Sequence, residues 1–344
     1  MPEKTFNSRR PTQADVARVA GVSQAMVSYV LNGKKIIPIS PETRQRVLNV
    51  VSELGYEPDS AARSLSMRKT FTLAGIIPDI TNPFFPSFER GIQKVTEASN
   101  YHLIVYNTDG VLENERKCIR FVRQGRVDGV IVVAAHLDTS DFKPLLDRNV
   151  AVVVLAKMES PVSVLPLDCL YVNDVAAAST AVDYLVKKGH RRVALINGHN
   201  GAPPNLNRFH GYVAALEGNN IPVEEALIRA ADYTPGEGYR AMRELLQLAE
   251  RPTAVFCTND LMAIGAMRAI HEAGLSIPGD IAVVGFDDVQ VASMVTPTLT
   301  TVAQFQEDLG RVAAEMLFER LGGKLPPVPR TREMPFKLIV RESA

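Results

Sequence analysis

Apolar side chains near the start of the chain have the spacing of two short helices joined by a tight turn. Two steeply crossing helices approach closely only at a small residue such as Ala17, and the turn needs a residue that tolerates positive φ, such as Gly21. The shared apolar seam is expected to consist of Val16, Val19, Val22, Val27 and Val30. This pattern predicts a helix-turn-helix over residues 12–32, with an ordinary helical hairpin as the alternative.

A third helix is predicted to complete this helical unit. Ser40 suits an N-cap, Pro41 the first helical position and Gly55 the stop, so we expect a helix over 41–54 and a headpiece over residues 10–56. Asp59 or Ser60 can cap a further helix of about two turns, which is marginal alone in water. Residues 57–69 are therefore interpreted as a hinge.

From residue 71 onwards, apolar runs of strand length alternate with amphipathic helical patterns. Strands that are buried on both faces read as unbroken apolar runs, so this alternation predicts parallel sheets covered by helices. The expected strands are 71–77, 103–106, 130–134, 152–155, 193–196, 254–257, 281–285 and 337–340. The expected helices are 88–98, 113–123, 175–188, 211–218, 236–248, 261–273 and 304–321. This number of strands exceeds one doubly wound sheet and predicts two α/β subdomains.

Charge is unevenly distributed along the 344 residues, although the formal net charge is zero. Residues 1–69 hold eleven Lys or Arg and six Asp or Glu, a balance of +5, which leaves −5 for the rest. A basic head on an acidic body suits a head that neutralises phosphates. Because the three cysteines are far apart, we expect no disulfide and no zinc site. Without a signal peptide or a membrane-length apolar run, the expected location is the cytoplasm.

Several short motifs stand in one order along nearly the whole chain, from about residue 12 to 341. They are Asp15-Val-Ala-Arg-Val-Ala-Gly-Val-Ser, Val27-Ser-Tyr-Val-Leu-Asn, Ala62-Arg-Ser-Leu, Asn82-Pro-Phe-Phe, Gly189-His-Arg-Arg-Val-Ala-Leu-Ile, Thr258-Asn-Asp and Gly285-Phe-Asp-Asp. Together they resemble the family of the lactose and purine repressors. The resemblance implies an all-α helix-turn-helix headpiece and a periplasmic-binding-protein-like core over 70–344. It also implies a homodimer on a palindromic DNA operator, with affinity controlled by a small-molecule effector.

Within that core, the subdomain boundaries are expected at particular residues. The N-subdomain is predicted to hold about 70–165 and 296–322, and the C-subdomain about 166–295 and 323–344. The effector is expected in the cleft between them, and no cofactor or metal is expected.

The resemblance also implies which residues bind DNA. Ser23 is expected to cap the recognition helix, while Gln24 pairs with adenine, Ala25 touches a thymine methyl and Tyr29 reads a base edge. A solvated helix face is the alternative for Gln24 and Tyr29. Leu65 matches a leucine that wedges into the minor groove, unless it only packs the hinge helix against its dimer mate. The complete expected set is Thr12, Ser23, Gln24, Ala25, Met26, Ser28, Tyr29, Asn32, Ala62 and Leu65.

The effector residues are expected where core strands end, because open parallel sheets bind ligands beyond the carboxyl ends of their strands. An aspartate accepts and an arginine donates in a fork, which together suit a hydroxylated ligand. The expected set is Asp79, Phe84, Phe85, Lys157, Arg208, Asn259, Asp260 and Asp287. Asn259 and Asp260 have an alternative role as helix caps, Asp287 as a turn residue, and the phenylalanines as plain core.

The ligand class stays open at this level. Many sugar-responsive relatives carry an acidic residue where this chain has Ala156-Lys157, and the aromatic residue of purine-responsive relatives is also absent there. Lys157 raises the hypothesis of an anionic effector, such as a sugar phosphate or acid. The expected partner is a small-molecule metabolite, a sugar or sugar derivative. Whether ligand releases DNA or recruits it is also open.

Two other function classes are weighed against a regulator. A solute-binding protein of the periplasmic type would need no helical headpiece. A Rossmann enzyme would carry Gly-x-Gly-x-x-Gly after the first core strand, which this chain does not. The chain is therefore expected to be a transcription regulator, with a repressor as the favoured kind, and not an enzyme.

Overall fold

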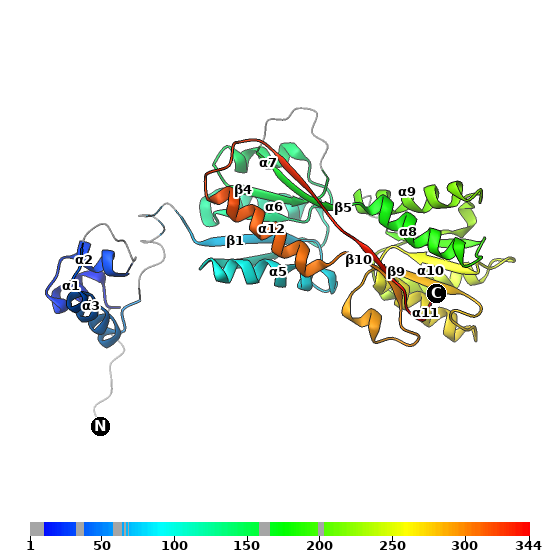
Figure 1. Ribbon diagram of the computed structural model, residues 1–344, viewed down its shortest axis with the longest axis horizontal. Coiled ribbons are helices and arrows are strands. Elements are labelled where there is room, and N and C mark those ends of the chain that lie inside the picture. The colour runs from blue at the N-terminus through cyan, green and yellow to red at the C-terminus, as the bar shows by residue number, and fades with distance from the viewer. Residues whose placement is uncertain are drawn as a thin grey trace, which may run out of the picture. The chain divides into compact units, whose positions relative to one another are not determined.

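A computed structural model describes residues 10–31, 38–57, 64, 67, 69–157, 166–198 and 203–344. The chain divides into two compact units, Met1–Thr70 and Phe71–Ala344. Figure 1 shows the elements of each unit along the chain.

In its described residues the first unit contains the helices α1 (Gln13–Ala20), α2 (Gln24–Leu31) and α3 (Pro41–Leu54). The predicted turn is confirmed, because Gly21 ends α1 with φ of 65°. The predicted bounds of α3 are also confirmed, and the Ser40 hydroxyl accepts the amide hydrogen of Thr43 at 3.2 Å. Gly55, with φ of 62°, ends this helix as expected. Local capping chemistry therefore fixes both ends of the third helix.

The core of the headpiece differs from the predicted seam at one position. Val16 and Val27 are fully buried and Val30 nearly so, but Val19 is 47 % exposed. Position 19 points away because α3 approaches α1 from the side of Val16 and Ala20, and supplies buried Val47 and Val50 instead. The prediction of a core role for Val19 is wrong, while the rest of the seam is confirmed.

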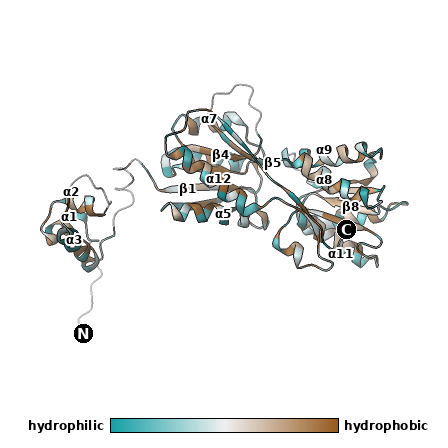
Figure 2. Cartoon of the chain, viewed as in Figure 1, coloured by the Kyte–Doolittle hydropathy of each residue, from teal (hydrophilic) through white to brown (hydrophobic). Residues whose placement is uncertain are grey.

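In its described residues, the second unit contains two six-stranded sheets. Sheet A has the order β11-β5-β4-β3-β1-β2 and is parallel throughout. Its strands are β1 (Thr72–Ile77), β2 (His102–Asn107), β3 (Gly129–Val132), β4 (Ala151–Leu155), β5 (Asp168–Val172) and β11 (Arg330–Met334). Helices α5 (Phe84–Ala98) and α12 (Gln306–Leu321) cover one face, and α6 (Leu112–Phe121) and α7 (Thr139–Leu146) cover the other. In Figure 2 the central strands of this sheet are predominantly hydrophobic, as burial on both faces requires.

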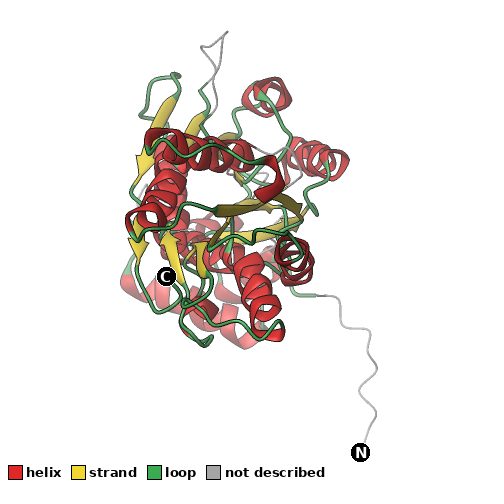
Figure 3. Cartoon of the chain, turned by 90° about the vertical axis from the view of Figure 1, so that its right-hand side faces the viewer, coloured by secondary structure: helices red, strands yellow, loops and turns green. Residues whose placement is uncertain are grey.

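Sheet B repeats this architecture with the order β12-β10-β9-β8-β6-β7. Its strands are β6 (Val193–Gly198), β7 (Ile228–Ala231), β8 (Ala254–Cys257), β9 (Ala282–Asp287), β10 (Thr300–Ala303) and the antiparallel edge strand β12 (Lys337–Ile339). Helices α8 (Asp174–Lys187) and α9 (Pro203–Gly218) cover one face, and α10 (Pro235–Leu246) and α11 (Asp260–Glu272) the other. Figure 3 shows these helices as layers around the strands. The predicted pair of doubly wound α/β subdomains is confirmed.

The chain passes between the two sheets three times, and this corrects the predicted boundaries. The passages lie at residue 173, at residues 304–305 and at residues 335–336. Strand β5 belongs to sheet A because it pairs with β4, and β10 belongs to sheet B because it pairs with β9. Strand β11 pairs with β5 and also belongs to sheet A. The expected divisions at 165/166, 295/296 and 322/323 are therefore wrong by one strand each.

The three cysteine side chains occupy buried positions of the kind that small apolar side chains take. Cys118, Cys169 and Cys257 are all buried. Burial raises the pKa of the Cys118 thiol and of the Cys257 thiol, which leaves both as neutral small hydrophobes.

Candidate functional site

The second helix of the headpiece presents its first turn to solvent. The Ser23 hydroxyl accepts the amide hydrogen of Met26 at 3.2 Å, so the predicted cap is confirmed. Gln24 and Ala25 are exposed, whereas Met26, Ser28 and Tyr29 are half-buried. The polar side chain of Gln24 and the small side chain of Ala25, both in the exposed first turn of this helix, can therefore approach base edges.

Thr12, expected to contact DNA, has a structural role at the start of α1. Its hydroxyl donates to the Asp15 carboxylate at 2.7 Å and accepts the Asp15 amide hydrogen, which makes a capping box. The hydrogen bonds lower the pKa of Asp15. The other expected DNA residues, Asn32, Ala62 and Leu65, lie outside the described residues.

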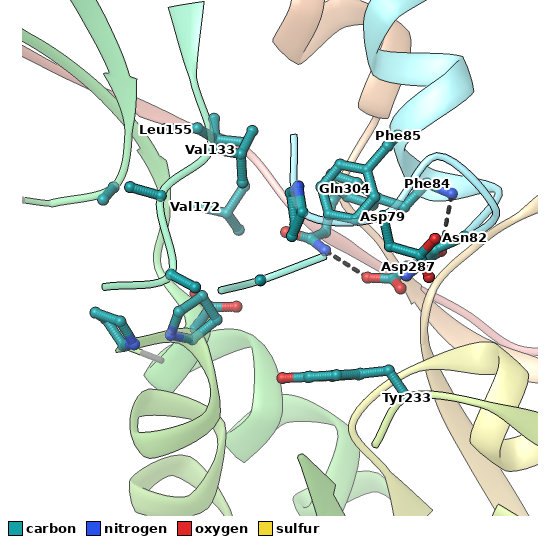
Figure 4. A pocket seen from close by; sticks show the side chains of 18 of the residues that line it. Asp79, Asn82, Phe84, Phe85, Val133, Leu155, Val172, Tyr233, Asp287 and Gln304 are labelled. Carbon is teal, nitrogen blue, oxygen red and sulfur yellow. Dashed lines mark hydrogen bonds between the residues drawn. The ribbon is translucent and has the colours of Figure 1, made fainter. Parts of the chain in front are cut away.

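A cavity of about 560 Å³ lies between sheets A and B, at the carboxyl ends of their strands. Sheet A contributes residues that follow β1, β3 and β4, and sheet B contributes residues that follow β7 and β10 together with Asp287 at the end of β9. Figure 4 shows aliphatic side chains on one wall, aromatic rings on two others, and Asp287 with Gln304 between them. Of the predicted effector residues, the cavity brings together Asp79, Phe84, Phe85, Lys157, Arg208 and Asp287.

Arg208 on α9 is the central cation of this cavity. Its Nε donates to Asp174 Oδ1 at 2.8 Å, and its Nη1 donates to the Thr258 carbonyl at 2.6 Å. The same Nη1 lies 3.9 Å from Asp287 Oδ1. The guanidinium carbon also lies 3.9 Å from the centre of the Phe286 ring, a stacking distance. With its side chain only 9 % exposed, Arg208 is fixed in direction before any ligand arrives.

Burial shifts the ionisation of the acids around Arg208. Burial raises the pKa of Asp287 to about 7, although the positive charge of Arg208 and a 2.7 Å hydrogen bond from Gln304 both oppose the rise. Burial likewise raises the pKa of Asp174, against the pull of Arg208. One arginine thus serves two desolvated carboxyls, and a hydroxylated ligand that donates to them would replace missing solvation.

Three residues that follow β1, namely Asn82, Phe84 and Phe85, form another wall of the cavity. Phe84 and Phe85 begin α5 and meet edge to face, with ring centres 5.2 Å apart. The Asn82 side-chain oxygen accepts the amide hydrogen of Phe84 at 3.1 Å and fixes the start of this helix. The segment after β1 therefore supplies apolar rings and polar groups in one turn.

Tyr233, after β7, is a cavity residue that sequence reasoning missed. Its φ of 71° is rare for a residue with a side chain, and its ring occupies the space above Gly198, where a Cβ would lie 2.4 Å from the ring. Burial raises the pKa of the Tyr233 hydroxyl. No local pattern marks it, because both its backbone conformation and its match to Gly198 depend on the tertiary fold.

Asn259 and Asp260, both expected to bind effector, lie outside the cavity lining. The Asn259 side chain caps α11 by accepting the Met262 amide hydrogen at 2.9 Å, and donates to the Tyr233 carbonyl at 3.0 Å. Asp260 is fully buried and accepts hydrogen bonds from the Val289 amide and the Thr301 hydroxyl. The side-chain polar atoms of Asn259 and Asp260 therefore bind other parts of the protein and are not directed at a ligand.

Carboxylates outnumber cations around the cavity. Among the described lining residues are five aspartates and two cations, Arg208 and Lys157. Lys157 is exposed, and its ammonium lies 5.7 Å from the centre of the Tyr171 ring. A ligand in this cavity therefore meets more negative than positive charge.

Comparison with known proteins identifies the family. Residues 12–59 match the model of bacterial regulatory proteins of the lacI family, and residues 182–344 match the periplasmic binding protein-like domain. The chain is 35 % identical over 313 residues to the HTH-type transcriptional repressor PurR of Vibrio atlanticus, covering 91 % of this chain and 92 % of that protein. The chain belongs to the lacI family. This confirms the resemblance drawn from the motifs.

Solved structures extend the match of this lacI-family chain. A lac repressor dimer bound to operator and the anti-inducer ONPF gives a TM-score of 0.84 at 26 % identity, covering 97 % of this chain and 99 % of that one. A complex of the transcriptional regulator CelR with cellobiose gives 0.73 at 30 % identity, covering 97 % and 100 %. Each match covers 97 % of this chain and therefore extends over its headpiece and both of its sheets.

The described part of this lacI-family chain lacks two further kinds of feature. Its His, Cys, Asp and Glu side chains do not gather in any group of three that could hold a metal ion. None of its helices is both long and apolar enough to span a membrane.

Proposed function

We propose that this protein is a transcriptional repressor that binds a palindromic operator as a homodimer and is controlled by a small molecule in the cavity around Arg208. One observation carries the proposal. A capped helix-turn-helix and a polar cavity between two α/β sheets occur in one chain that matches known repressors over about nine tenths of its length. Acting on DNA, such a repressor works in the cytoplasm.

The headpiece is proposed to read DNA through the first turn of α2. Gln24 can donate to and accept from adenine, and Ala25 can contact a thymine methyl in the major groove. The open amide groups behind Ser23 face a phosphate. Ser28 and Tyr29 stand one turn further along the helix and are proposed to extend the same contact. Asn32, Ala62 and Leu65 remain part of the proposed interface.

The effector is proposed to be an uncharged, polyhydroxylated molecule of sugar size. Arg208 donates, Asp287 accepts, and Phe84, Phe85 and Tyr233 supply flat apolar surface, the combination that suits the two faces of a sugar ring. The excess of aspartates opposes an anion, so a neutral sugar is favoured over the sugar phosphate that Lys157 alone suggested. The cellobiose complex of CelR supports this class.

Ligand binding is proposed to close the cleft. Because the cavity takes residues from both sheets, a bound ligand favours the arrangement in which they approach. In the described part of residues 71–344, the covalent connections between the sheets are the three inter-sheet segments, so these segments absorb the change and transmit it toward the headpiece.

The test is selection of binding sites from random duplex by the full-length protein, with and without a panel of neutral sugars and sugar phosphates. We expect a palindrome to be enriched, and its affinity to change at least several-fold with a neutral sugar. The Gln24→Ala variant should lose sequence preference but keep non-specific binding, since phosphate contacts carry the latter. Enrichment of no palindrome under any metabolite at moderate ionic strength contradicts the proposal.

The second candidate function is solute binding alone, which the match of residues 182–344 to the periplasmic binding protein-like domain favours. Removal of residues 1–69 discriminates between the two. A solute-binding protein would keep its whole activity, whereas a repressor would keep ligand affinity and lose operator binding.

A further inference from the structure

One glutamate of helix α6 is completely buried. Glu115 lies in the first turn of this helix, and its exposed fraction is 0 %. A buried carboxyl group is costly unless hydrogen bonds satisfy it. The Ala135 amide donates to Glu115 Oε1 at 2.8 Å, and the His136 amide donates to Oε2 at 3.2 Å. Glu115 therefore binds the segment that follows β3 and not a neighbour on its own helix.

The segment after β3, residues 133–138, is fixed at both of its ends. At its start, the Val133 amide donates to a carbonyl of β1 at 2.8 Å. At its end, the Asp138 side chain caps α7 and accepts the Ser140 amide hydrogen at 2.6 Å. Between these ends, Glu115 binds two consecutive peptide groups. The direction of these peptide groups therefore depends on Glu115.

This arrangement turns two carbonyl oxygens away from α6. In a trans peptide the C=O bond points opposite to the N–H bond of the same peptide group. Because the Ala135 and His136 amides point at Glu115, the carbonyls of Ala134 and Ala135 point away from it. No described amide or side chain donates to either oxygen. Both alanines line the cavity around Arg208, are half-buried, and have only a methyl group to cover the backbone.

We propose that Glu115 is a positioning residue for the effector. It holds the Ala134 and Ala135 carbonyl oxygens toward the cavity, where they accept hydrogen bonds from hydroxyl groups. The proposal rests on the proposed function of the cavity and names the chemistry of one of its walls. A carbonyl oxygen attracts a hydroxyl donor and repels a phosphate or carboxylate oxygen, which has no hydrogen to donate. This wall therefore selects a group that donates, as a neutral sugar does.

The first turn of α6 also supplies a matched control. Glu113 lies two positions before Glu115, but its side chain is 61 % exposed and pairs with Arg120 at 2.9 Å. The two glutamates thus have the same charge near the same helix start, and only the buried one binds the cavity segment. Replacement of either by glutamine removes one negative charge, so a difference between the two variants reports the contacts of Glu115.

The first test is hydrogen exchange in the full-length protein without ligand. The Ala135 and His136 amides should exchange slowly in wild type. Glu115→Gln should speed their exchange about tenfold or more, because its side chain has a single acceptor oxygen and turns an NH₂ group toward one of the two donors. Glu113→Gln should leave their exchange unchanged. Equal exchange in Glu115→Gln and wild type overturns the proposal.

The second test asks whether the two carbonyl oxygens meet hydroxyl groups of a ligand. D-glucose, D-ribose and cellobiose, each with its singly deoxygenated forms, are titrated calorimetrically into wild type and both variants. For a sugar that binds wild type, at least one deoxygenated form should bind about three- to tenfold more weakly, as loss of one hydrogen bond requires. That ratio should approach one in Glu115→Gln and persist in Glu113→Gln. A purely structural role would weaken all forms of the sugar alike.

The variant Glu115→Asp covers the case in which Glu115→Gln fails to fold. It keeps the charge but is one methylene shorter, so it should show the same faster exchange and the same loss of discrimination. If a sugar binds and the Glu115 variants discriminate its forms as wild type does, the role of the carbonyls is refuted while the function of the cavity stands. If no probe binds, the proposed function fails and the hydroxyl contacts fail with it, and hydrogen exchange still decides whether Glu115 orients the segment.

Discussion

At the scale of single residues, the cavity is organised by one cation among several acids. Arg208 is held by Asp174, the Thr258 carbonyl and the Phe286 ring before any ligand is present. This arrangement costs desolvation that a surface ion pair does not. Preorganisation of that kind lowers the entropy that ligand binding must overcome.

Replacement of Arg208 by methionine should lower the free energy of unfolding at pH 8 by about 3–5 kcal/mol, because two buried carboxyls lose their cation. The loss should shrink as pH falls through the range around 7, since Asp287 then takes up a proton. Urea unfolding at pH 8 and pH 5.5 measures both effects. The matched control is Arg240→Met, whose ion pairs with Glu237 and Glu244 are exposed and should be worth less than about 1 kcal/mol. Equal losses in the two variants at pH 8 would contradict the assigned role.

Part of the candidate sites can be predicted from the sequence. The caps at Ser23 and Ser40 and the turn at Gly21 depend on neighbours within a few positions, so the sequence alone indicated them. Arg208 and Asp287 came from resemblance to the family. Tyr233 and Gln304 were not predicted from the sequence. Tyr233 reaches the cavity through a positive φ, and Gln304 lies in a segment that passes between the sheets; neither feature has a local sequence signature.

At the scale of elements, the central strands can be predicted from the sequence more readily than the strands at the sheet edges. The central strands of both sheets are apolar and were found, whereas β11 reads Arg-Thr-Arg-Glu-Met and is partly exposed. An edge strand with one covered side needs little hydrophobicity, so its composition resembles that of a loop. The residues of β5, β10 and β11 were assigned to the wrong subdomain for a different reason, because pairing with strands elsewhere in the chain decides which sheet they join.

The two capping serines of the headpiece make a matched pair of tests. Ser40→Ala and Ser23→Ala should each lower headpiece stability by about 1 kcal/mol, because each removes one hydrogen bond to an amide at a helix start. Only Ser23→Ala should also weaken operator binding at a temperature where both variants stay folded. Circular dichroism melts and gel-shift titrations on the selected operator measure the two effects. Equal loss of DNA affinity in the two variants would remove the special role of Ser23.

At the scale of the whole molecule, the cavity belongs to both sheets and to neither alone. A ligand that contacts both should stabilise the two subdomains together. At a free concentration one hundred times its dissociation constant, an effector should add about 2.7 kcal/mol to the free energy of unfolding. Calorimetry with a panel sugar should then show the whole core shift to higher temperature as one transition. If only one of two separable transitions moves, the ligand binds a single subdomain, which contradicts the proposed cleft.

The three passages between the sheets also bear on how the chain is made. Sheet A lacks α12 and its edge strand β11 until residues 306–321 and 330–334 have left the ribosome. The headpiece is complete within its first 57 residues and has a core of its own, so it acquires its shape early in translation. A nascent polypeptide thus carries a folded helix-turn-helix long before the cavity between the two sheets exists. Truncated products from interrupted synthesis would accordingly retain affinity for nucleic acid but would be unable to respond to the effector.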